Sequence, residues 1–233
     1  MRREPEILDL CKYLTRCGAR ITGAGESAIT IEGVDTLYGC SHMVIPDRIE
    51  TATYMAATAV TGGSIVLKSI YPQHIATVLP AFEESGCKVL QGNGEISIVA
   101  PQRLHRIRSI RTMPYPGFPT DAQAPTMAMM TVADGTSVFI ENIFESRYKH
   151  VGELMRLGAR IKIEGRVAVV EGVPRLSGAQ VECTDLRGGA ALVIAGLVAE
   201  GVTEVTQIHH LDRGYEKLEE SLCNLGAVIR RLE

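Results

Sequence analysis

The sequence has 233 residues, of which 45% are hydrophobic and 22% are charged, a composition typical of soluble globular proteins. The formal net charge of −3 does not indicate a nucleic-acid-binding protein or a protein that binds an anionic membrane surface. No apolar stretch reaches membrane-spanning length without charges, and the first residues lack the apolar core of a secretory signal. We therefore expect a cytoplasmic protein.

A short pattern recurs four times along the chain: a helix that ends at a glycine and is followed by a strand. The glycines are Gly18, Gly86, Gly158 and Gly226, so the steps between them are 68, 72 and 68 residues. Glycine is the usual residue just after a helix because that position takes a left-handed backbone conformation. The spacing predicts a structural repeat of roughly 70 residues, which suits a compact α/β unit.

Each repeat contains further elements in the same order. Strand patterns are predicted at 28–34, 95–100 and 167–173. A second helix type is predicted at 46–63, 119–135 and 184–201, and each copy is followed by a strand, namely "SIVLKSI", "SVFIENIF" and "EVTQIHHL". This second helix is apolar on every face, which indicates that it is buried on all sides. The sequence therefore predicts an α/β fold of pseudo-threefold repeats, with buried helices inside and sheets outside.

Each of the apolar helices begins with an aspartate: Asp47, Asp121 and Asp185. An aspartate at a helix start caps free backbone N–H groups and suits the positive end of the helix dipole. Related repeats also bring the three helix starts to one end of the bundle, where they favour an anion. Arg48 and Arg187 lie one and two residues beyond two of these aspartates, so we expect a site for a substrate that carries hydroxyls and phosphates or carboxylates.

The repeats are incomplete at both ends of the sequence. The last repeat stops at Glu233 without its closing strands, whereas residues 1–46 supply a helix and strands with no apolar helix before them. We therefore expect residues 1–46 to be the end of an N-terminal domain, residues 47–233 to form a C-terminal domain, and the chain to be about half of a longer protein. The open sheet edge could pair with residues 20–46 of a second copy by strand swapping.

The six cysteines and the histidine pair indicate no metal site. None of the cysteines forms a CxxC pair or has the spacing to histidines that zinc requires. Cys17, Cys87 and Cys223 are interpreted as small core residues, and Cys40 and Cys183 are predicted in strands. The His209–His210 pair follows a predicted strand and is interpreted as structural. The basic cluster in "RLHRIRSIR" is interpreted as the solvated face of an edge strand, and it comprises Arg103, Arg106, Arg108 and Arg111.

Seven motifs, in order, resemble the C-terminal half of the UDP-N-acetylglucosamine enolpyruvyl transferases: "REPEI", "PDRIET", "FPTDAQA", "FESRYKHV", "LSGAQV", "TDLR" and "LDRGYEKLE". The resemblance covers essentially the whole chain. It implies a two-domain inside-out α/β barrel with the active site between the domains. It also implies transfer of enolpyruvyl from phosphoenolpyruvate to the 3-hydroxyl of UDP-N-acetylglucosamine, with release of phosphate and without metal or cofactor. This reaction is the first committed step of peptidoglycan synthesis.

The resemblance also assigns site residues. Asp121 of "FPTD" corresponds to the candidate general base that faces the sugar hydroxyl, a role a carboxylate within hydrogen-bond reach can perform. Ile143 corresponds to the position that binds the uridine nucleotide through its backbone. Near phosphoenolpyruvate the resemblance places Arg147, Asp185, Arg187 and Arg213, of which Arg213 is also assigned a catalytic role. Arg48 is a further candidate substrate ligand.

Other interpretations remain open from the sequence. Without the resemblance, Arg213 is a helix-start residue and Arg147 a surface charge. The shikimate-pathway enolpyruvyl transferase and a non-catalytic repeat scaffold are the alternative functions. The Lys-Asn pair and the catalytic cysteine loop that the resemblance implies would lie before Met1, so we expect the chain to be inactive alone and its partner to be the missing N-terminal half.

Overall fold

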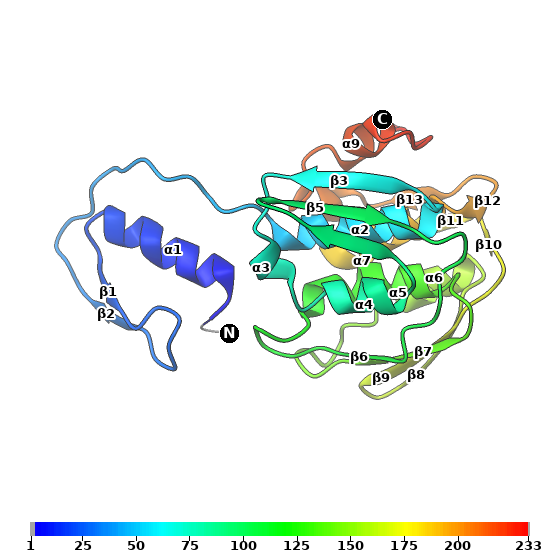
Figure 1. Ribbon diagram of the computed structural model, residues 1–233, viewed down its shortest axis with the longest axis horizontal. Coiled ribbons are helices and arrows are strands. Elements are labelled where there is room, and N and C mark those ends of the chain that lie inside the picture. Colours follow the sequence, from blue (N-terminus) through cyan, green and yellow to red (C-terminus); the bar gives the residue numbers. More distant parts are fainter. Residues whose placement is uncertain (1–2, 233) are drawn as a thin grey trace.

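Three apolar helices form the centre of the molecule, which the computed structural model describes over residues 3–232 (Figure 1). They are α2 (Arg48–Thr61), α5 (Gln123–Met130) and α7 (Leu186–Gly196). Every residue of α5 is buried, as are residues 188–195 of α7 and most of α2. The three helices pack against one another. The burial predicted from their all-round apolar character is therefore confirmed.

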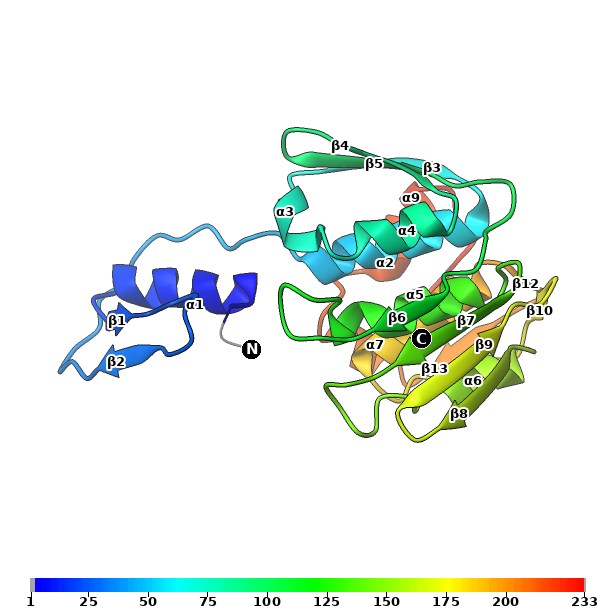
Figure 2. The same cartoon turned by 60° about the horizontal axis from the view of Figure 1, so that its bottom comes forward.

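Two larger sheets form outer layers on opposite sides of these helices (Figure 2). One sheet is antiparallel with the order β3-β5-β4, and the other has the order β6-β7-β9-β8, in which β6 runs parallel to β7. In the second sheet Phe139 lies opposite Ala168, and both side chains are buried. The strands are β3 (Ser64–Lys68), β4 (Lys88–Gln91), β5 (Glu95–Val99), β6 (Ser109–Arg111), β7 (Thr136–Ile140), β8 (Arg160–Glu164) and β9 (Val167–Glu171).

Two short parallel ribbons complete the outer layer. Strand β10 (Leu176–Ser177) pairs with β12 (Ala199–Glu200), and β11 (Gln180–Glu182) pairs with β13 (Glu204–Thr206). The helices thus lie inside and the strands outside, as expected. The strands described here form separate sheets rather than a closed barrel.

The helices that end at glycine are also present. They are α1 (Pro5–Arg16), α4 (Leu79–Glu84), α6 (Val151–Arg156) and α9 (Leu218–Asn224). The glycine after each of them has a positive φ, from +92° at Gly86 to +101° at Gly18. The predicted helix ends and their left-handed glycines are confirmed, but the strand predicted after Gly226 is wrong, since residues 227–232 form no strand. The two remaining short helices are α3 (Pro72–Ile75) and α8 (His209–Asp212).

The N-terminal unit projects from one side of the body (Figure 1). It consists of α1 and the antiparallel pair β1 (Arg20–Thr22) and β2 (Thr30–Glu32), and it continues into an extended linker over residues 33–47. The Arg48 side chain joins this unit to the body, because its Nε lies 2.7 Å from Glu6 Oε1. No helix within residues 3–232 is long and apolar enough to cross a membrane.

Several details differ from the sequence expectations. The last predicted strand ends at Thr206, and His209 and His210 begin α8 instead, because Gln207 takes a φ of +56° that breaks the extended backbone. Cys40 lies in the extended linker without strand partners, and Cys183 follows β11.

Some of the cysteines and arginines interpreted from the sequence lie where they were expected, and others do not. Cys17 and Cys87 are buried as expected, but Cys223 is exposed and is therefore not a core residue. The basic cluster is also mostly not in a strand: only Arg111 belongs to the edge strand β6, and the other three arginines precede it.

Candidate active site

Asp121 lies in a single 3₁₀ turn, η1 (Thr120–Ala122), that leads directly into α5. Asp47 and Asp185 each accept two backbone N–H groups at the starts of α2 and α7, as predicted. The same prediction is wrong for Asp121, whose side chain caps neither η1 nor α5. The reason is local: Pro119 takes the N-cap position of η1, so Asp121 lies within the turn and its carboxylate is available to other groups.

Two arginines approach that carboxylate. Arg147 Nη2 donates to Asp121 Oδ1 at 2.5 Å, and Arg187 Nη2 lies 3.8 Å from Asp121 Oδ2. The Asp121 side chain is 43% exposed, whereas the Arg147 and Arg187 side chains are only 19% and 12% exposed. The site is therefore a half-exposed carboxylate held between two mostly buried guanidinium groups. Oδ2 accepts no hydrogen bond from any residue between 3 and 232.

Arg187 is anchored to α2 through a tyrosine. Its Nη1 lies 3.1 Å from the Tyr215 hydroxyl, and its guanidinium carbon lies 5.5 Å from the centre of the Tyr215 ring. The same hydroxyl lies 2.9 Å from Thr53 Oγ1 of α2. Burial raises the pKa of Tyr215, although Arg187 opposes the shift, so the hydroxyl stays protonated and can donate to Thr53. The starts of α2, α5 and α7 are thus linked at one place by side-chain contacts.

A buried glutamate connects Asp121 to the segment that carries Arg147. Glu141 is 1% exposed and follows β7. Its Oε2 accepts from the Thr120 hydroxyl at 2.9 Å, and its Oε1 accepts from the Thr112 hydroxyl at 2.9 Å and from the Ile143 and Phe144 N–H groups at 2.8 and 3.1 Å. Four donors to one carboxylate hold the η1 turn and residues 143–144 in fixed relation. Glu141 is not among the residues predicted from the sequence, although a glutamate directly after an apolar strand is a usable signal.

The contacts of Glu141 also limit which backbone group of Ile143 can bind a ligand. Its N–H group is already occupied, so a ligand can bind its backbone only through the carbonyl. Phe144 is half-exposed, and the Arg147 guanidinium carbon lies 5.5 Å from its ring centre. This contact orients Arg147 toward Asp121.

The remaining predicted residues lie outside this cluster or support it. Asp185 caps α7 just before Arg187 and so helps to position that arginine. Arg48 is directed to Glu6 and lies 5.4 Å from the centre of the Tyr115 ring, so it contacts the N-terminal unit rather than Asp121. Arg213 follows α8 and is exposed, and no side chain within residues 3–232 binds it.

Beneath the cluster lie buried polar atoms without partners. Arg147 Nε, both ring nitrogens of His150 and Gln123 Oε1 lack hydrogen-bond partners of good geometry among residues 3–232. Burial lowers the pKa of His150 to about 4, although the nearby Asp185 charge opposes the shift. His150 is therefore a neutral ring at physiological pH and adds no positive charge to the two arginines.

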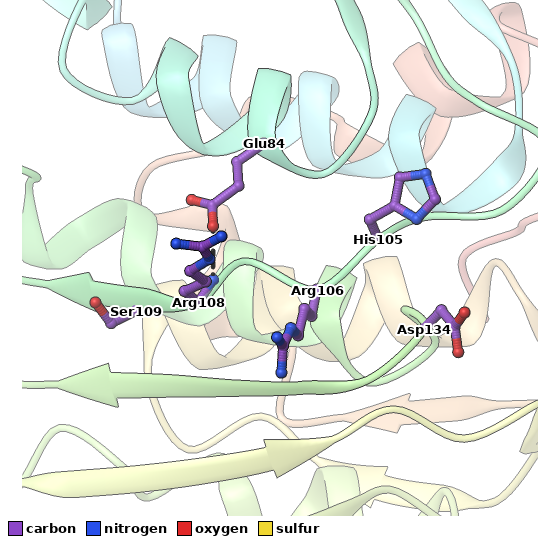
Figure 3. A pocket seen from close by; sticks show the side chains of 6 residues that line it. All are labelled: Glu84, His105, Arg106, Arg108, Ser109 and Asp134. Carbon is purple, nitrogen blue, oxygen red and sulfur yellow. Dashed lines mark hydrogen bonds between the residues drawn. The ribbon is translucent and has the colours of Figure 1, made fainter.

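A surface hollow lies elsewhere. It has a volume of about 790 Å³ and lies beside the end of α4 and the segment before β6 (Figure 3). Glu84 accepts the Arg108 backbone N–H group at 2.9 Å, and Asp134 lies 3.4 Å from Arg103 Nη2. Two carboxylates and two arginines line the hollow, so its charges largely offset one another. Its lining residues are Glu84, His105, Arg106, Arg108, Ser109 and Asp134. None of the predicted site residues lines it.

The Asp121 cluster can carry out two kinds of chemistry. Guanidinium groups bind carboxylate or phosphate through two parallel hydrogen bonds. A carboxylate oxygen such as Asp121 Oδ2 can accept a proton from a substrate hydroxyl within hydrogen-bond distance. No group of three or more histidine, cysteine, aspartate or glutamate side chains in residues 3–232 could hold a metal ion.

Comparisons with known proteins identify the family of the chain. A sequence profile of the family described as EPSP synthase (3-phosphoshikimate 1-carboxyvinyltransferase) matches residues 1–222. The chain belongs to this enolpyruvyl transferase family. It is 53% identical over 98% of its length to a UDP-N-acetylglucosamine 1-carboxyvinyltransferase of Caldanaerobacter subterraneus subsp. tengcongensis, and 52% identical over 98% to one of Myxococcus xanthus.

Solved structures of enolpyruvyl transferases share the fold. The crystal structure of the enolpyruvyl transferase NikO from Streptomyces tendae superposes with a TM-score of 0.84 at 28% identity and covers 97% of the chain. An EPSP synthase from Acinetobacter baumannii superposes with a TM-score of 0.68 at 18% identity over 95% of the chain, which shows the fold alone. The chain spans 55% and 54% of the length of the two curated relatives and 54% of NikO. The members it resembles are thus about twice as long.

Proposed function

We propose that this chain provides one side of the active site of a UDP-N-acetylglucosamine 1-carboxyvinyltransferase. The reaction transfers enolpyruvyl from phosphoenolpyruvate to the sugar 3-hydroxyl, releases phosphate and begins peptidoglycan synthesis in the cytoplasm. The observation that carries the proposal is 53% identity over nearly the whole chain to a relative of that name. The cluster of Asp121, Arg147 and Arg187 adds chemical support.

The contacts suggest a role for each residue of the cluster. Asp121 Oδ2, which accepts no hydrogen bond within residues 3–232, receives the proton of the sugar hydroxyl as the new C–O bond forms. Arg147 stays hydrogen-bonded to Asp121 Oδ1 and so fixes the direction of Oδ2. Arg187, held by Tyr215, binds the carboxylate or phosphate of phosphoenolpyruvate, and Asp185, which caps α7, positions Arg187 beside that substrate.

Three further residues belong to the proposal. Arg213 is exposed and free to act as a catalytic cation on the departing phosphate. Ile143 contacts the uridine nucleotide through its carbonyl, since its N–H group is bound by Glu141. Arg48 can bind substrate only if it releases Glu6. The reaction as proposed needs no metal and no cofactor.

We also propose that the polypeptide has two domains and that the chain contains parts of both. Residues 1–46 are the end of an N-terminal domain, and residues 47–233 are the C-terminal domain without its last strands. Catalysis by closing two domains around two substrates needs both walls of the cleft, because closure fixes geometry and excludes water. The missing partner is therefore the N-terminal half, and strand-swapped self-association is an alternative way to cover the open edge.

The decisive experiment is a phosphate-release assay with phosphoenolpyruvate and UDP-N-acetylglucosamine. The chain alone should release no phosphate, whereas the chain mixed with the upstream half of the Caldanaerobacter relative should do so. In the mixture Asp121→Asn should reduce turnover by about a hundredfold or more, the usual effect of losing an acid–base group. Asp134→Asn is the matched control, because Asp134 is exposed and paired with Arg103 outside the cluster.

Three results would contradict the proposal. Turnover by the chain alone would show that no second wall is needed. Normal turnover by Asp121→Asn would remove the proposed base. Turnover with shikimate 3-phosphate instead of the sugar nucleotide would favour the other enzyme of the family, for which the matching profile is named.

A further inference from the structure

Two cysteines far apart in the sequence meet at the end of α1. Cys17 follows α1 and is buried, and Cys40 is partly buried in the extended linker. Their sulfur atoms lie 3.1 Å apart. Among residues 3–232 both are free thiols.

Contacts on both sides of Cys40 hold the linker in this position. The Tyr38 N–H group donates to the Cys17 carbonyl at 2.7 Å, and the Tyr38 ring packs over Gly18, where an added Cβ would lie 3.2 Å from the ring. Beyond Cys40, His42 Nε2 lies 3.0 Å from Asp9 Oδ1 on α1, and both side chains are largely buried. The two thiols therefore meet because the linker is fixed to α1 before and after Cys40.

We propose that Cys17 and Cys40 form a reversible dithiol–disulfide site. The oxidant is a small disulfide such as oxidised glutathione. The thiolate of Cys40, the more accessible of the two, attacks one glutathione sulfur and releases one reduced glutathione. The Cys17 thiolate then attacks the Cys40 sulfur of the mixed disulfide and releases the second. Two cysteine thiols lose two protons and two electrons, and one oxidised glutathione becomes two thiols.

The surroundings of Cys40 affect the rate of this exchange, and the resulting disulfide changes how the linker is held. The hydrogen bond with Cys17 and desolvation raise the pKa of the Cys40 thiol, so exchange should accelerate as the pH rises. The bond would close residues 17–40 into a covalent loop that includes β1 and β2. While it lasts, it would join the first part of the linker covalently to α1, in addition to the contact of His42 with Asp9 beyond Cys40.

Tryptic mapping can test this directly, because trypsin separates the cysteines. Cleavage after Arg16, Arg20 and Arg48 places Cys17 in peptide 17–20 and Cys40 in peptide 21–48, whereas Cys11 lies in a separate peptide that ends at Lys12. The folded chain is equilibrated in mixtures of reduced and oxidised glutathione at pH 8, alkylated and digested without reductant. Peptides 17–20 and 21–48 should remain joined, and they should separate when a reductant is added.

Two comparisons make the test specific. Cys17→Ser and Cys40→Ser should abolish the joined peptide, whereas Cys223→Ser, which removes an exposed thiol elsewhere, should leave it unchanged. In the wild-type chain, folding should favour the bond about tenfold or more over the same chain in urea, because the native fold brings the thiols together. Equal cross-linking in urea, or a glutathione adduct on Cys40 that never resolves, would overturn the proposal.

Discussion

Glu141 shows how one buried side chain can hold a site together. It touches neither Asp121 nor Arg147, yet it binds Thr120 next to the first and the backbone of residues 143–144 near the second. Because its oxygens accept from two hydroxyls and two N–H groups, its removal would leave several buried donors without acceptors. Glu141 should therefore tolerate fewer substitutions than the exposed site residues.

Two replacements of Glu141 should separate the contribution of its hydrogen bonds to stability from that of its charge. In Glu141→Gln the amide oxygen can still accept the two N–H groups, and the Thr120 hydroxyl can rotate to accept from the amide nitrogen. We expect a loss of about 1 kcal/mol or less in unfolding free energy, whereas Glu141→Leu should lose about 2 kcal/mol or more. Urea unfolding measures both. Glu164→Leu, at an exposed position of β8, is the control, and equal losses for Gln and Leu would refute the network argument.

His150 gives a pH dependence with a defined sign. Burial lowers its pKa to about 4 in the folded chain, compared with 6.5 in the unfolded chain. Between these values the unfolded chain binds more protons, so this residue's contribution to stability is complete above pH 6.5 and is lost as the pH falls toward 4. From pH 7 to pH 5 the contribution amounts to about 2 kcal/mol.

The variant His150→Leu isolates this contribution from the carboxylates that titrate nearby. Its unfolding free energy should fall by about 2 kcal/mol less than that of the wild-type chain between pH 7 and pH 5. Urea unfolding at both pH values gives the difference, and His209→Gln, at an exposed residue of α8, should not alter it. An unchanged pH dependence in His150→Leu would mean that burial does not lower the pKa of the ring in the folded chain.

At the level of elements, the local sequence pattern predicted the features that depend on nearby residues, namely buried helices and helix ends. The apolar residues of α5 and α7 identified buried helices, and glycines at the ends of α1, α4, α6 and α9 identified helix ends. The start of α5 was missed because a 3₁₀ turn intervenes there, and turn type depends on the chain around it. Arg147 lies 26 residues from Asp121, and composition and periodicity could not reveal their contact, whereas the repeats already placed Arg187, 66 residues away, at the same end of the bundle.

Helix α7 contains a glycine whose role is steric. A Cβ added at Gly189 would lie 2.2 Å from Cys183 Sγ and 2.9 Å from Leu211 Cγ, so α7 can approach these residues only without a side chain there. Gly189→Ala should therefore destabilise the chain by about 1–3 kcal/mol, although alanine favours helix formation. Gly152→Ala in α6 is the matched control, since nothing lies within 4 Å of its added Cβ.

The two glycine variants should change the unfolding free energy in opposite directions. Gly152→Ala should stabilise the chain by about 0.5 kcal/mol through the unfolded state and helix propensity. Urea unfolding of both variants under one set of conditions provides the comparison. If Gly189→Ala also stabilised the chain, the close contact between α7, Cys183 and Leu211 would not exist in solution.

At the level of the whole molecule, the body and the N-terminal unit differ in how they are supported. The body encloses its helices between sheets, whereas β1 and β2 form a two-stranded ribbon of three residue pairs with mostly exposed side chains. Such a ribbon is marginal without further strands or a covering layer. If residues 1–46 complete a domain whose other part lies upstream, that part would provide the missing cover.

Hydrogen exchange can test this difference in support. In the chain alone, the amides of β1 and β2 should exchange within seconds, whereas those of α5 should exchange only on global unfolding. After the upstream half of the Caldanaerobacter relative is added, β1 and β2 should become protected, while α5 should change little because it is already buried. Mass spectrometry of peptides from residues 20–32 and 123–130 follows both regions in one sample. Unchanged exchange in β1 and β2, under conditions where the mixture is active, would show that this ribbon is not part of a shared domain and that the boundary at residue 46 is misplaced.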